Sequence, residues 1–129
     1  MAKQATEIEY TESSFKLNEF SHTILDITVK FEVLKMKDSC FIWIGDNSNP
    51  LFSDLSFGIK SLYSPYPVAT KILGTASTDT TSLTIAEKLC KKLKKPVYLS
   101  FNVPITSNYL LEEVEKRLNE EIEINCEIF

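Results

Sequence analysis

The clearest pattern in the chain is an alternation of apolar and polar residues that begins after residue 24. The apolar positions of this run are Leu25, Ile27, Val29, Phe31 and Val33. A period of two predicts a strand with one buried face and one wet face. We expect this strand to open at His22 or Thr23 and to follow a shorter strand near 14–20. The phase slips at Val33 and Leu34, which predicts a β-bulge there.

The following strand, 40–44, has no polar side. Cys40, Ile42 and Ile44 alternate with Phe41 and Trp43. A strand that is apolar on both faces lies inside a sheet with cover above and below. Two helices can roof only one face, so either the sheet curls on itself or a partner protein covers the other. Phe41 and Trp43 are therefore candidate partner-binding residues, with simple core packing as the alternative.

The rest of the chain continues as hairpins and then a helix–strand–helix unit. Strands are expected near 54–60, 68–73 and 97–101, and helices over 80–94 and 107–123. The apolar residues at helical spacing are Leu83, Ala86, Leu89, Cys90 and Leu93 in the first helix, and Leu110, Leu111, Val114, Leu118 and Ile122 in the second. This order predicts an α+β fold with a mainly antiparallel sheet of about six strands and two main helices. A single domain, 13–129, is expected to follow a flexible tail, 1–12.

A loop rich in hydroxyl groups precedes the first helix. Its candidate partner-binding residues are Thr75, Ser77, Thr78, Asp79, Thr80 and Thr81. The loop lacks the glycine pattern of a phosphate loop or dinucleotide fingerprint, and it has no GxSxG elbow. The alternative to binding is a structural role in which Asp79 or a neighbouring threonine caps the helix. Thr84 and Glu87 offer a capping box one turn later.

Charge and composition exclude several classes of function. The net charge of −4 opposes general nucleic-acid binding. No membrane segment, signal peptide, metal site or cofactor site is expected, since His22 is the only histidine and the three cysteines are far apart. Residues 71–95 are locally basic and 106–129 locally acidic, which indicates either solvated helix faces or docking patches. We expect a non-enzymatic protein in the cytoplasm, with the nucleus as a further location.

Several blocks of the chain, in order and spacing, resemble the proteasome assembly chaperone 4 family. They span roughly residues 15–123 and begin with Asn18-Glu19-Phe20-Ser21. The further blocks are Asp38–Gly45, Pro67-Val68 with Ile72–Gly74, Ser77–Thr81, Ala86–Leu89 and Val97–Asn102, followed by the glutamate-rich last helix. The tail, the Asn47–Leu51 turn and the Tyr63–Tyr66 segment depart from the family.

The resemblance implies a small non-catalytic chaperone. It implies a heterodimer with proteasome assembly chaperone 3, which has the same fold, and a homodimer is a further possibility without that partner. The pair would bind α-type subunits while the 20S α-ring forms, and leave before maturation. The alternative is an interaction or adaptor domain of another complex, either a scaffold or an RNA-binding protein that uses the lysine-rich helix.

Overall fold

The structure is a computed structural model that describes residues 8–11, 15–74 and 80–129. Residues 8–11 are exposed and belong to no helix or strand. The division into a tail, 1–12, and a domain, 13–129, stays a prediction, because most of the tail lies outside the described residues.

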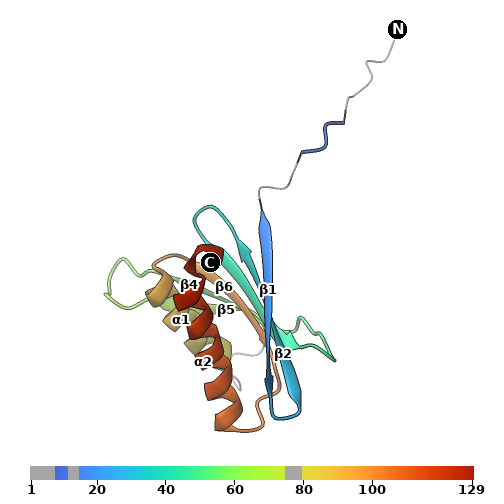
Figure 1. Cartoon of the computed structure of the whole chain (residues 1–129). Coiled ribbons are helices and arrows are strands. Elements are labelled where there is room, and N and C mark those ends of the chain that lie inside the picture. The colour runs from blue at the N-terminus through green and yellow to red at the C-terminus, as the bar shows by residue number, and fades with distance from the viewer. Residues whose placement is uncertain (1–7, 12–14, 75–79) are drawn as a thin grey trace.

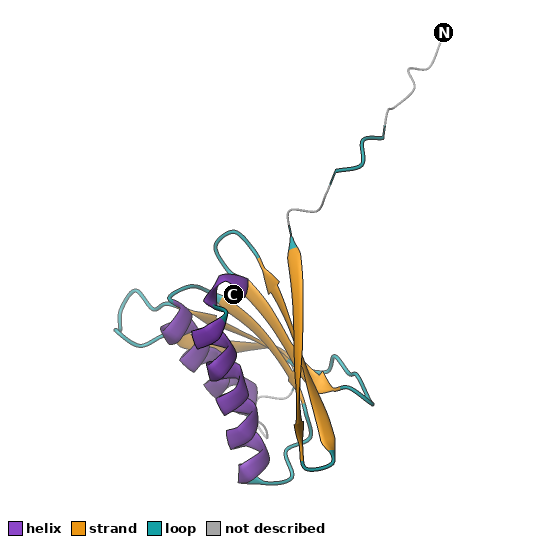
Figure 2. Ribbon diagram, in the orientation of Figure 1, coloured by secondary structure: helices purple, strands orange, loops and turns teal. Residues whose placement is uncertain are grey.

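Within the described residues, one sheet and two α-helices form a two-layer fold (Figures 1 and 2). The elements are β1 Lys16–Ile24, β2 Ile27–Lys35, β3 Cys40–Asp46, β4 Leu55–Ile59, β5 Val68–Leu73, α1 Thr81–Leu93, β6 Val97–Asn102, α2 Asn108–Ile124 and the short 3-10 helix η1 Cys126–Ile128. The strand order is β1-β2-β3-β6-β4-β5. Only β3 and β6 run parallel, so the predicted α+β fold with a mainly antiparallel sheet is confirmed.

Both helices lie on the same face of the sheet, here called the helix face (Figure 2). The strands present their apolar residues to this face at alternate positions, because successive side chains of a strand point to opposite sides. The fully buried residues from three strands are Val29, Phe31 and Val33 of β2, Cys40, Ile42 and Ile44 of β3, and Val97 and Leu99 of β6. Leu89 of α1 and Val114 of α2 pack onto them in one core.

The first hairpin turns later than the sequence predicts. His22 and Thr23 lie inside β1, and Ile24 pairs with Ile27 across a two-residue turn. Leu25 is in that turn with a left-handed φ of 55°, and 70% of it is exposed. The prediction was wrong because Leu25 has the parity of the buried residues of β2, so periodicity alone placed it in the strand.

The predicted bulge at Val33 and Leu34 is also wrong. β2 pairs with β1 and β3 without a register shift, and the irregularity lies between Leu55 and Ser56 of β4 instead. The phase slip has another cause. Leu34 is apolar although it faces away from the helices, where it lies beside Phe41.

Helix α1 starts at Thr81, and its close packing on the sheet depends on a glycine. Its N-cap, Thr80, makes no side-chain cap bond, and the Thr84 hydroxyl donates to the Thr80 carbonyl, so the predicted Thr84 capping box is wrong. Asp79 lies outside the described residues. A Cβ at Gly58 of β4 would lie 2.8 Å from the Ala86 carbonyl oxygen, so only glycine lets the helix approach this closely.

The two helices bury most of the residues that helical spacing selects. In α1, Ser82 and Ile85 are buried in addition to the predicted Ala86, Leu89 and Cys90, while Leu83 and Leu93 are half-buried. In α2, four of the five predicted residues are buried and Leu111 is half-buried. Ser107 caps α2 by accepting a hydrogen bond from the Leu110 N–H.

Candidate functional site

The sheet face opposite the helices, here called the open face, carries a row of apolar side chains. Strand register places five residues in this row, one from each of β1, β2, β3, β6 and β4: Leu17, Leu34, Phe41, Tyr98 and Phe57. The polar residue Thr70 of β5 follows Phe57 at the edge of the sheet. The rings of Phe57 and Tyr98 lie 4.5 Å apart between centroids. The row is therefore a continuous apolar band that neither helix covers.

Trp43 lies beside this row and is held by its own strand and the next loop. Its indole Nε1 donates to the Leu51 carbonyl at 2.9 Å. A Cβ at Gly45 would lie 2.3 Å from the indole ring, so the ring lies against a position that only glycine leaves free. Trp43 is buried in consequence.

The loop after β3 supplies part of the cover that the doubly apolar strand requires. Phe52 stacks on Phe41 with centroids 6.0 Å apart, and Leu51 lies at the same hollow as Trp43. The outer sides of Leu51 and Phe52 remain about half exposed. The chain thus covers Trp43 itself and presents new apolar surface at the edge of the open face.

Apart from Leu17 and Leu34, which belong to the apolar row, the open face has an apolar half and a polar half. On β4 and β5, Ile59, Val68 and Ile72 are exposed. On β1 and β2, Lys30 lies 3.4 Å from Glu19 and 3.3 Å from Glu32. Hydrogen bonds to Glu32 and Glu19 raise the pKa of Lys30. The polar half satisfies its charges internally, whereas the apolar half has side chains that burial against a partner would stabilise.

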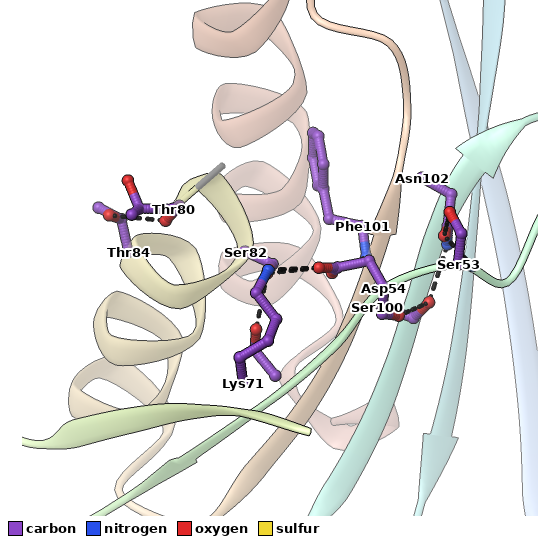
Figure 3. Close-up of polar contacts among 10 residues, drawn as sticks. Ser53, Asp54, Lys71, Thr80, Ser82, Thr84, Ser100, Phe101 and Asn102 are labelled. Carbon is purple, nitrogen blue, oxygen red and sulfur yellow. Dashed lines mark hydrogen bonds and ion pairs between the residues drawn. The ribbon is translucent and has the colours of Figure 1, made fainter. Parts of the chain in front are cut away.

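A second cluster, of polar side chains, lies where β4, β5, β6 and α1 meet (Figure 3). Asp54 Oδ1 accepts hydrogen bonds from Lys71 Nζ at 2.5 Å and Ser82 Oγ at 3.1 Å, and its Oδ2 accepts from the Phe101 N–H at 3.1 Å. Lys71 also donates to Ser82 at 2.8 Å. The side chains of Lys71 and Asp54 are only 7% and 15% exposed.

This cluster has the chemistry of a structural anchor. A serine beside a lysine could form a nucleophile and its base. Here Lys71 donates to both the Asp54 carboxylate and Ser82, so it is not placed to take the serine proton. Ser100 Oγ donates to the Asp54 carbonyl at 2.6 Å and adds a further tie to β6. The cluster fixes the first turn of α1 to three strands.

The sequence-predicted site residues divide between these regions and the undescribed loop. Phe41 and Trp43 lie on the open face, with Trp43 covered by the Leu51 loop. Thr80 is the exposed N-cap of α1 and Thr81 is its first residue. Thr75, Ser77, Thr78 and Asp79 lie outside the described residues. Their role in binding stays a prediction.

Sequence reasoning missed the rest of the apolar row and the Asp54 cluster. Phe57 lies between Ser56 and Gly58, and Tyr98 lies between Val97 and Leu99. In strands this short, the sequence pattern does not show which face either aromatic ring lies on. Lys71 did give one, as the single charge in the otherwise uncharged strand 68–73. Its partner could not be found, because Asp54 is distant in sequence and meets Lys71 only through strand pairing.

The two predicted charge patches face each other in part. Lys88 Nζ lies 3.0 Å from Glu115, and Lys92 Nζ lies 3.7 Å from Glu123, so residues of α1 pair with residues of α2. Exposed pairs of this kind add little stability. They show that the glutamates of α2 are partly neutralised within the domain.

The described residues were also compared with what a metal site, a membrane-spanning helix or a reactive cysteine requires. They contain no group of three or more metal-ligating side chains, and no helix among them is long and apolar enough to span a membrane. Cys40 and Cys90 are buried in the core, and Cys126 is exposed. Burial raises the pKa of Cys40 to about 11, which makes its thiol a poor nucleophile.

Comparisons with known proteins agree with the arrangement of strands and helices. One chain of a crystal structure of a chaperone complex for yeast 20S proteasome assembly matches with a TM-score of 0.57 and 16% identity, over 82% of this chain and 98% of that chain. At this identity the match shows the fold alone.

Sequence comparison reaches further than the fold. Proteasome assembly chaperone 4 of Mus musculus is 35% identical over 92% of this chain and 94% of its own length. The protein of the same name from Homo sapiens is 36% identical over 88% of this chain and 89% of its own length. The family model of proteasome assembly chaperone 4 matches residues 28–103, which run from β2 to the end of β6. The chain therefore belongs to the proteasome assembly chaperone 4 family.

Proposed function

We propose that this protein is a non-enzymatic chaperone of proteasome assembly, and that its open face binds a second chaperone of the same fold. The observation that carries the proposal is the apolar row from Leu34 to Phe57, which crosses four strands and is covered by neither helix. Burying such a row removes apolar area from water, which is the main driving force of association. The names of the related proteins support the role in proteasome assembly.

The proposed partner is proteasome assembly chaperone 3, bound as a heterodimer. A partner with the same fold would bring a sheet of its own, and two sheets pack face to face with interdigitating side chains at about 10 Å. The partner would lie over the row from Leu34 to Phe57 and over β5. It would leave the Glu19, Lys30 and Glu32 ion pairs uncovered, because these gain nothing from desolvation. Without the partner, two copies of this chain would use the same face.

The pair would act on α-type subunits of the 20S proteasome while the α-ring forms. A chaperone that occupies one face of a subunit decides which neighbours can dock there, and so disfavours wrong ring orders. It must leave before maturation, which suits an interface of moderate area. The loop Thr75–Thr81 is the proposed contact with the subunit. The proposed location of the protein is the cytoplasm and also the nucleus.

Co-expression with a chaperone-3-like protein tests the partner. We expect a one-to-one complex on sizing with light scattering, and a monomer or homodimer for this chain alone. A chain that stays monomeric beside its folded, soluble candidate partner would contradict the proposal.

The subunit contact has a separate test. Asp79→Ala should weaken binding of the chaperone pair to α-type subunits while the melting temperature stays unchanged. A lower melting temperature with unchanged binding would assign Asp79 to capping the helix instead.

A further inference from the structure

One end of the sheet, here called the lysine end, gathers basic residues from chain segments that are far apart in sequence. It is the end at which β1, β3 and β6 start and β2 and β4 finish. The lysines at or next to these strand ends are Lys16, Lys35, Lys37, Lys60, Lys94 and Lys95. Asp38 is the one acidic residue in the three connections 36–39, 60–67 and 94–96. This concentration is unexpected in a chain of net charge −4.

Strand register shows how closely these lysines are brought together. Lys16 of β1 is directly opposite Lys35 of β2. Gly58 of β4 is opposite Val97 of β6 at the end of their pairing, so Lys60 and Lys95, each two residues further on, come at the same end of the sheet. Like charges directly opposite one another across two strands are destabilising. The fold therefore holds one unfavourable lysine pair, Lys16 and Lys35, at the end of the sheet where Lys60 and Lys95 also lie.

The structure relieves only part of this repulsion. Lys35 Nζ donates to the Glu127 carbonyl at 2.8 Å, which turns that side chain toward η1. Lys95 is close enough to the thiol of Cys40 to oppose the effect of burial on its pKa. Lys37, Lys60 and Lys94 are exposed. These three side chains come from three different connections and all remain open to a binding partner.

The order of the strands turns the lysines into a ridge. From β1 to β4 the strands follow as β1, β2, β3, β6 and β4, so the ridge from Lys16 to Lys60 crosses four strand spacings. At about 4.8 Å per spacing the ridge is roughly 19 Å long, which matches about six residues of an extended peptide. The end of the ridge at Lys60 also carries exposed apolar residues. Next to Lys60, Leu62 and Tyr63 are almost fully exposed.

We propose that the lysine end binds an extended acidic segment of a protein partner, running across the strand ends from Lys16 to Lys60. Exposed Leu62 and Tyr63 give this segment apolar contacts beside Lys60. A short peptide fits better than a nucleic acid, because the chain has a net charge of −4 and a long polyanion would extend beyond the ridge. The site lies on the rim of the sheet, and the proposal does not depend on the proposed function of the open face.

The test uses the full chain and a labelled peptide with about six consecutive glutamates, the length that the ridge accommodates. The variant K37Q/K60Q/K94Q removes three exposed charges from the ridge. The control K30Q/K88Q/K116Q changes the net charge equally at positions away from it. Fluorescence anisotropy at low salt gives the affinities. Far-UV circular dichroism checks that both variants are folded.

The ridge variant should bind the peptide about tenfold more weakly than the unaltered chain, and the control within about twofold, since three partly screened charge contacts together amount to roughly one tenfold step. Equal losses in both variants would show general charge attraction and overturn the proposal. So would an unaltered chain that does not bind the peptide. Tighter binding of a single-stranded RNA of equal charge would also overturn it and assign the ridge to nucleic acid.

Discussion

The two faces of the sheet carry apolar side chains at neighbouring positions of the same strands, but the helices cover only one face. In β6, Leu99 is fully buried beneath the helices, while Tyr98 points to the open face and is half-buried. In β3, Ile42 and Phe41 show the same contrast. Parity along a strand therefore separates residues that stabilise the fold from residues available for binding.

The largest expected difference in unfolding free energy is between a residue of the helix face and a residue of the open face in β6. Leu99→Ala leaves a cavity under the helices and should lower the free energy of unfolding by about 2–5 kcal/mol. Tyr98→Ala should lower it by only about 1 kcal/mol, because much of that side chain is already in water. Urea unfolding followed by circular dichroism measures both. Equal losses would mean that the open face is as much a part of the core as the helix face.

The Asp54 cluster is a polar counterpart of the helix-face core. Asp54→Asn removes the charge that pairs with the buried Lys71 and should cost about 3 kcal/mol of unfolding free energy. Adding Lys71→Met should recover part of this loss, because the uncompensated cation is then gone. Urea unfolding of the single and double variants gives the coupling. Strict additivity of the two changes would show that the pair does not act as an ion pair.

Gly45→Ala tests whether the Trp43 indole on the open face needs the space that Gly45 leaves free. The added methyl group would overlap the Trp43 indole and push it off the Leu51 carbonyl, at a cost of about 1–3 kcal/mol. Trp43 is the only tryptophan, so its emission should shift to longer wavelength as the ring is exposed. Ser48→Ala, in the turn that follows β3, is the control. Unchanged emission in Gly45→Ala would show that the indole does not need this space.

The sequence predicts the fold well where a pattern is local. The alternation from Ile27 to Val33 locates β2, and the helical spacing locates both helices within two residues. Turns are less predictable, since Leu25 has the parity of a core residue although it lies in the turn. Pairing between distant segments cannot be read from periodicity. The parallel β3–β6 contact and the Asp54–Lys71 pair both depend on it.

The candidate site shows the same limit. The apolar character of Phe41 and Trp43 identified β3 as a strand with a second apolar face. Periodicity could not show that Tyr98 and Phe57 continue the row, because that depends on the order of the strands. Nor could it show that Leu51 and Phe52 fold back to cover Trp43 and Phe41.

The smallest expected effect concerns the pH dependence of helix α2. Burial acts to raise the pKa of Glu121, but hydrogen bonds from Arg117 and Asn125 and the Arg117 charge outweigh it and leave the pKa below its usual value of 4.5. Because the pKa of Glu121 is lower in the folded state than in the unfolded state, Glu121 stabilises the fold when the pH lies above the usual glutamate pKa. This stability is lost as the pH falls through the folded pKa.

Arg117→Met should therefore lower stability near neutral pH and reduce the further loss of stability on acidification, because the pKa of Glu121 is then no longer held down by Arg117. Urea unfolding between pH 3 and pH 7, about the range in which glutamates titrate, measures the change. Lys116→Met, at the exposed neighbouring position, is the control. Identical pH profiles for the two variants would remove Arg117 as the cause.

Two matched charge insertions test whether the apolar half of the open face binds the partner chaperone. Tyr98→Glu places a carboxylate within the apolar row, and Ser21→Glu places one on the polar half of the same face. Both variants are titrated with purified chaperone-3-like partner by calorimetry. We expect Tyr98→Glu to weaken binding by at least about 30-fold, because it places a charge in the centre of an interface, and Ser21→Glu to change it by less than about threefold. Equal affinities of the two variants, with the partner still bound, would contradict this expectation.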